Sequence, residues 1–410
     1  MNGKATVRYY LLVLVILSFF FFSNDFGLTD VQKTALVIAV GIDKEEDDFI
    51  VTTQIAVPKS KDSGENSASA EIVSKGKTVA AAFEKLNQKT GWYPKLVFCD
   101  LIVLGEEATK VNVMQSLGGF IRNEYLSDSC QLAVCDGKAQ DILTAKVPTE
   151  ALSGLAAVKV LSDHAKRVGN VLPNTLREFA ITYFGESGSG LLPVLSLQKT
   201  TEDTHATPNS GGSSSQQGGQ SSGQSGQSGQ GGQSQASGQK QQEQVFSASE
   251  TAVFAKGVRV GKLTAKETKG VAFALNKLRL ATYSIGAQDQ IYSLLVKRST
   301  GKINLNFKED TPTLEIKIDA TAGLNATSKA EELRHLADPA EMPEGLLPTA
   351  AETLKNELLA VFYKTKEWNA DVFGCLQELK RKEFKRYEEE KDSILQKIEP
   401  KISVTFKNVR

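Results

Sequence analysis

The chain has 410 residues, 40% of them hydrophobic, which is enough for two or three domains with their own cores. Lysine plus arginine number 48, as do aspartate plus glutamate, so the formal net charge is zero. This balance gives no electrostatic footprint for nucleic acid, and we expect no nucleic-acid partner.

The first residues predict a membrane-targeting segment. Lys4 and Arg8 precede an uncharged apolar run over residues 9–22, and Asp25 ends it. A basic flank, an apolar stretch and an acidic exit are typical of a secretory signal. The run is short for a span, which needs roughly 20 apolar residues, and no small-residue cleavage site follows. We expect residues 1–24 to be a signal or an uncleaved membrane anchor, with the following chain outside the cytoplasm.

Residues 25–199 alternate between strand and helix patterns. Strands are predicted over 35–42 and 49–57, joined by a solvated acidic turn at 43–48, and then over 96–104 and 130–135. A helix is predicted from Thr78, with Val79, Ala82, Phe83 and Leu86 on one face and Gly91 just past its end. Residues 114–125 also suit a helix. Thr175 and Glu178 form a capping box that opens a helix over 176–183.

A tract of glycine, serine and glutamine over residues 200–245 is the clearest internal boundary. Its repeated Ser-Gly-Gln units carry almost no apolar side chain, so it cannot bury enough surface to offset its ordering entropy. We interpret it as a flexible linker or an enlarged surface loop. An adhesive or prion-like role is the alternative, although the tract lacks the aromatic residues that such roles use.

Residues 246–410 resume the alternation. A hairpin is predicted over 250–255 and 258–260, a helix over 264–278, and one-sided strands over 303–307 and 314–320. Thr349 and Glu352 predict a capping box before a helix that buries Leu354, Leu358, Val361 and Phe362. A charged helix is expected through Phe384 and Tyr387, and an edge strand over 402–406. These patterns predict an α+β fold with mainly antiparallel sheets, packed helices and two to three domains, divided at 25–199 and 246–410.

The sequence offers no motif for catalysis, a cofactor or a metal. It has no nucleophile elbow, no metalloprotease motif, no Walker loop and no dinucleotide fingerprint. The glycine-rich residues 185–190 follow a helix and lack a lysine, which is typical of a loop. The carboxylates at 45–48 could attract calcium, but such a run is more often a solvated turn. We therefore predict a protein that is not an enzyme.

The cysteines are too sparse for a disulfide framework. Cys99, Cys130, Cys135 and Cys375 form no Cys-x-x-Cys pair, and we expect them mostly to be small buried apolar residues. A Cys130–Cys135 bridge stays open, because an extracytoplasmic compartment would permit it.

A series of short motifs resembles the Ger(x)C family, the C subunits of bacterial spore germinant receptors. In chain order these motifs lie at 35–44, 54–58, 76–78, 101–106, 136–143, 192–193, 251–254, 261, 267–270 and 371–374. Each is weak alone, and their order carries the resemblance. Members of this family are typically lipoproteins with a lipobox cysteine after the apolar run. This chain has no cysteine before Cys99, and residues 391–395 stand where the family often has tryptophan.

The resemblance implies a mixed α/β protein with no known catalysis on the outer face of the spore inner membrane. There it would assemble with a polytopic A subunit and a transporter-like B subunit that respond to amino acids, sugars or nucleosides. An uncleaved helix would replace the lipid anchor. The resemblance names no ligand-contacting residue. The alternatives are an anchored extracytoplasmic solute-binding or envelope adhesion module and, third, an anchored hydrolase.

Overall fold

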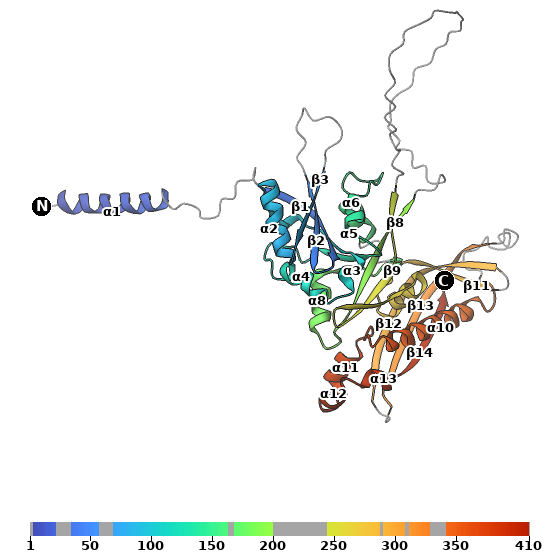
Figure 1. Cartoon of the computed structure of the whole chain (residues 1–410). Coiled ribbons are helices and arrows are strands. Elements are labelled where there is room, and N and C mark those ends of the chain that lie inside the picture. Colours follow the sequence, from blue (N-terminus) through green and yellow to red (C-terminus); the bar gives the residue numbers. More distant parts are fainter. Residues whose placement is uncertain are drawn as a thin grey trace, which may run out of the picture.

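The computed structural model describes residues 3–21, 34–56, 69–162, 168–199, 244–287, 290–307, 311–328 and 342–409. Two sheets with packed helices form the folded body (Figure 1), which confirms the predicted α+β class. The larger sheet contains β1 (Thr34–Glu45), β2 (Asp48–Ala56), β3 (Ser69–Gly76), β4 (Tyr93–Lys95), β5 (Leu101–Leu104), β6 (Gln131–Cys135), β7 (Asn174–Thr175), β8 (Ser189–Lys199), β9 (Gln244–Ala255) and β10 (Val258–Leu263). The smaller sheet contains β11 (Ala281–Ala287), β12 (Gln290–Asn306), β13 (Thr313–Thr327) and β14 (Glu399–Asn408).

The larger sheet is parallel at its centre and antiparallel at both ends. Its order is β10-β9-β8-β6-β5-β1-β2-β3, with β1, β5, β6 and β8 joined in parallel pairs. Helices cover it: α2 (Val79–Thr90), α3 (Glu106–Thr109), α4 (Met114–Ile121), α5 (Ala139–Thr144), α6 (Ser153–Val160) and α8 (Leu176–Phe184). Along β5, Ile102 and Leu104 face a core with α2, α4 and α8, while Leu101 and Val103 face a core with α5 and α6. Burial on both faces explains why this strand is apolar throughout.

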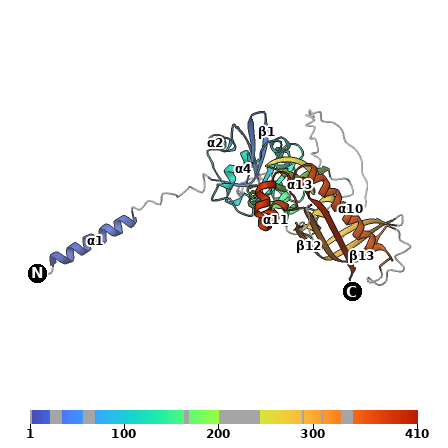
Figure 2. The same ribbon diagram turned by 90° about the horizontal axis from the view of Figure 1, so that it is seen from below.

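The smaller sheet packs against two helices and forms a third core. These helices are α9 (Ala265–Ala274) and the long α10 (Leu346–Glu367), which lies along the sheet in both views (Figures 1 and 2). Leu354, Leu358, Val361 and Phe362 of α10 are buried as predicted. The last helices are α11 (Cys375–Lys382), α12 (Phe384–Glu390) and α13 (Ile394–Lys397). β14 then pairs in parallel with β13 at the sheet edge, as predicted for a final edge strand.

The glycine-rich tract connects two neighbouring strands of one sheet. β8 and β9 pair antiparallel up to Lys199 and Gln244, the last residues described on either side of the tract. Strands from both predicted regions therefore share the larger sheet, which favours a loop between paired strands over a linker between separate bodies. The division into domains stays a prediction.

The helix α1 (Gly3–Phe21) stands apart from the folded body (Figure 1). Its apolar side chains from Tyr9 to Leu17 are exposed. None of the helices among the described residues has both the length and the apolar character needed to cross a membrane.

Several local predictions are confirmed. Thr78 caps α2 by accepting the Ala81 N–H at 3.1 Å, and Gly91 ends that helix with φ 70°. Thr175 and Glu178 form the predicted capping box of α8. The hairpins β1–β2 and β9–β10 lie where the alternating patterns placed them.

Other predictions are wrong for reasons of tertiary structure. The strand expected over 96–104 is divided into the 3-10 helix η2 (Leu96–Phe98) and β5. Asp43 is buried in β1 and not part of a solvated turn. Helix α10 begins at Leu346 after Gly345, so Thr349 is no cap, and its hydroxyl donates to the Gly345 carbonyl within the helix.

All four cysteines are free and buried, as small apolar residues would be. The open alternative of a Cys130–Cys135 bridge is not realised, because the two side chains enter different cores on opposite faces of the sheet. The Cys99 thiol and burial raise the pKa of Cys130. The Cys130 side chain is therefore held as a neutral thiol in the core.

Candidate docking surface

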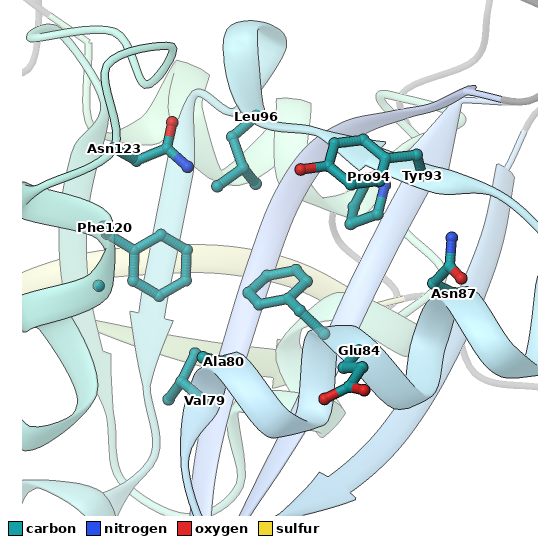
Figure 3. Close-up of a pocket in the computed structure, with 11 residues that line it drawn as sticks. Val79, Ala80, Glu84, Asn87, Tyr93, Pro94, Leu96, Phe120 and Asn123 are labelled. Atoms are coloured by element: carbon teal, nitrogen blue, oxygen red, sulfur yellow. The ribbon is translucent and has the colours of Figure 1, made fainter. Parts of the chain in front are cut away.

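An apolar groove lies between α2, α4 and the segment that contains β4 and η2 (Figure 3). Its volume is about 460 Å³, and its apolar walls include Val79, Phe83, Leu96 and Phe120. Among the lining residues that the structure describes, Glu84 alone is charged. A groove of this size and lining favours an apolar occupant.

Local signals in the sequence build this groove. Gly91 ends α2 and donates its N–H to the Asn87 carbonyl at 2.7 Å, which turns the chain back across the helix. The Asn87 side chain then donates to the Trp92 carbonyl at 3.0 Å and holds the returning segment in place. The rings of Phe83 and Phe120 meet edge to face, with centroids 5.8 Å apart, and join α2 to α4.

Large apolar side chains stand exposed beside the groove. The exposed fractions are 58% for Tyr93, 48% for Val97, 53% for Phe98 and 66% for Tyr125. The Lys95 ammonium lies 5.7 Å from the Tyr93 ring centre and 5.6 Å from that of Tyr125, close enough for cation–π attraction to both. We call these five residues the aromatic rim. Exposed apolar and aromatic surface of this kind is typical of an interaction site.

A second cavity, of about 330 Å³, is more polar and lies between β9, α9, β11 and α10. The Tyr283 hydroxyl donates to Glu357 Oε2 at 3.2 Å, and Lys269 Nζ donates to the Thr282 carbonyl at 2.8 Å. Burial raises the pKa of Glu357 and lowers the pKa of Lys269. These half-buried groups join α9, β11 and α10 at some electrostatic cost.

Replacing Glu357 with glutamine is expected to raise the free energy of unfolding at pH 7. Because burial raises the pKa of Glu357 above its ordinary 4.5, this group contributes most stability below that pH. The stability that Glu357 contributes falls as the pH rises from 4.5 through the raised pKa of Glu357 in the folded protein. Glutamine stays neutral and still accepts a hydrogen bond from the Tyr283 hydroxyl. The stability gained by Glu357→Gln should therefore vanish near pH 4. Urea unfolding at the two pH values measures it.

Glu352→Gln is the matched control, since Glu352 is exposed on the same helix. A loss of stability in Glu357→Gln at pH 7 would contradict the prediction, because it would mean that the ionised carboxylate stabilises the fold.

Hydrogen bonds and ion pairs tie the C-terminal helices to the larger sheet. The Asp371 N–H donates to Ser189 Oγ at the start of β8, at 2.9 Å. In the preceding turn, Glu186 accepts from Lys380 Nζ at 2.6 Å and from the Tyr387 hydroxyl. The two sheets are therefore held together by more than apolar packing.

No described group of three or more histidine, cysteine, aspartate or glutamate side chains is placed to hold a metal ion. All three histidines lie outside the described residues. The carboxylates at 45–48 are partly used in ion pairs: Glu45 with Lys138, and Asp48 with Lys75 and Lys77. Of the glycine-rich residues 185–190, residues 185–188 form the turn before β8, as the loop prediction expected, whereas Ser189 and Gly190 belong to β8.

Comparison with known families identifies both halves of the chain. A model of the spore germination protein N-terminal domain matches residues 28–197. A model described as spore germination B3/GerAC like, C-terminal, matches residues 249–410. The chain belongs to the Ger(x)C family. The resemblance predicted from the ordered motifs is thereby confirmed, and the matches leave out mainly α1 and the glycine-rich tract.

A solved member shares the Ger(x)C fold seen here. The crystal structure of the GerBC protein is 17% identical and superimposes with a TM-score of 0.50, covering 90% of this chain and 97% of that one. At this identity the likeness is one of fold. No curated protein matches the chain.

One Ger(x)C motif has a clear structural purpose. Asp371, in the motif at 371–374, is buried, and its carboxylate accepts the N–H groups of Cys375 at 2.7 Å and Leu376 at 2.9 Å. It therefore caps α11 while its own N–H reaches β8. Asp371 therefore helps to fix the C-terminal helices against the larger sheet.

Proposed function

We propose that this chain is the non-catalytic C subunit of a nutrient germinant receptor and takes part in spore germination at the spore inner membrane. The observation that carries the proposal is the match of both spore germination models, in order, along one chain. The polar contacts at Asp371 and Glu186, which join the two sheets, support a role as a scaffold or coupling element.

We propose that residues 1–24 attach this body to the membrane from the extracytoplasmic side. All nine side chains from Tyr9 to Leu17 are 50–73% exposed and apolar or aromatic, with Lys4 and Arg8 before them. Burying this helix surface in lipid would remove a large apolar area from water. Cys99, the first cysteine of the chain, is buried in the core, so this anchor takes the place of a lipid group.

The proposed partners are the integral membrane A and B subunits of the receptor. In this proposal regions 25–199 and 246–410 meet these subunits, and residues 200–245 lie between the two regions in the sequence.

Fractionation of sporulating cells that carry a C-terminally tagged chain tests this proposal. We expect the full-length protein in the membrane fraction, together with A-like and B-like subunits. Release in soluble form without such partners would contradict it.

Val13→Arg with Leu14→Arg should release the protein from the membrane, because each arginine costs about 2.5–3.5 kcal/mol within an apolar segment. Lys4→Arg keeps the basic flank and is the matched control. Retention of the double variant in the membrane would exclude α1 as the anchor.

A further inference from the structure

The folded body begins beside the aromatic rim. β1 is the first strand after α1, and its first residue, Thr34, pairs with Tyr93 of β4. Twelve residues separate Phe21 from Thr34, and a chain of that length spans at most roughly 45 Å. A tether through α1, which the proposed function supplies, would therefore keep the edge with Tyr93 within that reach of the bilayer surface. Such tethering raises the effective concentration of lipid at the rim.

The chemistry of the rim matches the boundary between lipid headgroups and acyl chains. Tyr93 and Tyr125 have an apolar ring and a polar hydroxyl, the combination found where a protein crosses this boundary. Lys95 lies between them, with its ammonium positioned to reach a phosphate while its stem stays on the rings. Val97 and Phe98 are purely apolar and stand exposed on the adjoining turn of η2.

The shape of the surface favours lipid over a partner helix. A partner helix would fill the groove, but Val97 and Phe98 are not among the residues that line it. They project outside the groove from a short 3-10 turn, as residues that insert into a bilayer surface do. Asp100 is exposed two residues after Phe98 and limits how deeply this turn can enter.

We propose that the aromatic rim is a second membrane contact, in which Tyr93, Lys95, Val97, Phe98 and Tyr125 enter the interface of a phospholipid bilayer. This inference rests on the proposed tether through α1. It adds an orientation: the α2–α4 side of the larger sheet faces the membrane, and the smaller sheet with α10 points away from it (Figure 2).

A fluorescent label at the rim tests this contact in the full-length protein. All four native cysteines are buried, so Val97→Cys offers one exposed thiol for an environment-sensitive dye. Ile291→Cys is the matched control, because Ile291 is 57% exposed on β12 of the smaller sheet. Both labelled proteins are reconstituted into phosphatidylcholine vesicles with or without brominated acyl chains, and flotation reports attachment separately.

We expect both proteins to float, with loss of fluorescence in brominated vesicles at residue 97 and none at residue 291. Flotation without quenching at residue 97 would overturn the rim contact and leave the tether standing. Absence of flotation would overturn both. If the dye at residue 97 is shielded from water only when A-like or B-like subunits are present, the rim is a contact with a protein partner instead.

A second substitution checks that the rim itself is responsible. Phe98→Ser should reduce quenching of a dye at Tyr125→Cys, whereas Phe384→Ser, which alters an equally exposed ring on α12, should not. Equal quenching in the two variants would contradict insertion of the rim. Both phenylalanines are exposed, so neither change removes a core side chain.

Discussion

Replacing Asp43 with alanine is expected to lower the free energy of unfolding by about 2–4 kcal/mol. Asp43 is 5% exposed in β1, and its two carboxylate oxygens accept the N–H groups of Ala139 at 2.7 Å and Gln140 at 3.0 Å. Alanine would leave both donors at the start of α5 without an acceptor in a buried site. Gly105 packs so closely that a Cβ there would lie 1.9 Å from Asp43 Oδ1. The site therefore has no room for a side chain larger than that of Asp43.

Urea unfolding followed by tryptophan fluorescence measures this effect. Asp43→Asn should lose less than Asp43→Ala, because the amide oxygen still accepts one N–H without burying a charge. Asp47→Ala, on the exposed turn of the same hairpin, should stay close to the parent. If Asp43→Ala is as stable as Asp47→Ala, the carboxylate does not hold α5 to β1.

The elements that could be predicted have their determinants close together in the chain. Thr78 and Gly91 bound α2, and Thr175 with Glu178 begins α8, through contacts only a few residues apart. Such caps are legible in one sequence because donor and acceptor belong to the same turn.

The errors concern residues whose partners are distant in the chain. Asp43 stands before five further charged residues, so composition assigns it to the solvated turn. The N–H groups that its carboxylate accepts, however, lie 96 and 97 residues further along the chain. Thr349 shows the opposite case. Thr349 and Glu352 match the capping-box pattern, but Thr349 is no cap, because the helix has already begun after Gly345, whose backbone lies in the left-handed region. Sequence patterns alone do not reveal which of two local signals the tertiary structure selects.

The rim could not be found from the sequence, because Val97 and Phe98 fall within the strand predicted over 96–104. Residues 96–98 continue the apolar run of β5, but the chain turns as η2 there, and Val97 and Phe98 face outward. Pro94 and Asp100, on either side of this stretch, were the available signals that the run is not one strand. Tyr125 joins the rim from a distant loop, which no local pattern could show.

Gly301→Ala is expected to lower the free energy of unfolding by about 3 kcal/mol, the upper part of the usual range for overpacking. A Cβ at Gly301 on β12 would lie 2.3 Å from the Phe273 carbonyl oxygen and 2.4 Å from that of Ala274, which belong to the backbone of α9 and cannot rotate away. Helix α9 packs against both sheets, and Thr268 also donates to the Thr251 hydroxyl of β9, so displacing α9 should loosen the two sheets together.

Gly286→Ala on β11 is the control: nothing lies within 4 Å of its Cβ position, and alanine there should raise the free energy of unfolding by about 0.5–1 kcal/mol. Urea unfolding and near-ultraviolet circular dichroism measure both variants. Equal stability of the two would mean that α9 does not set the spacing between the sheets, and the coupling role proposed for this body would lose its physical basis.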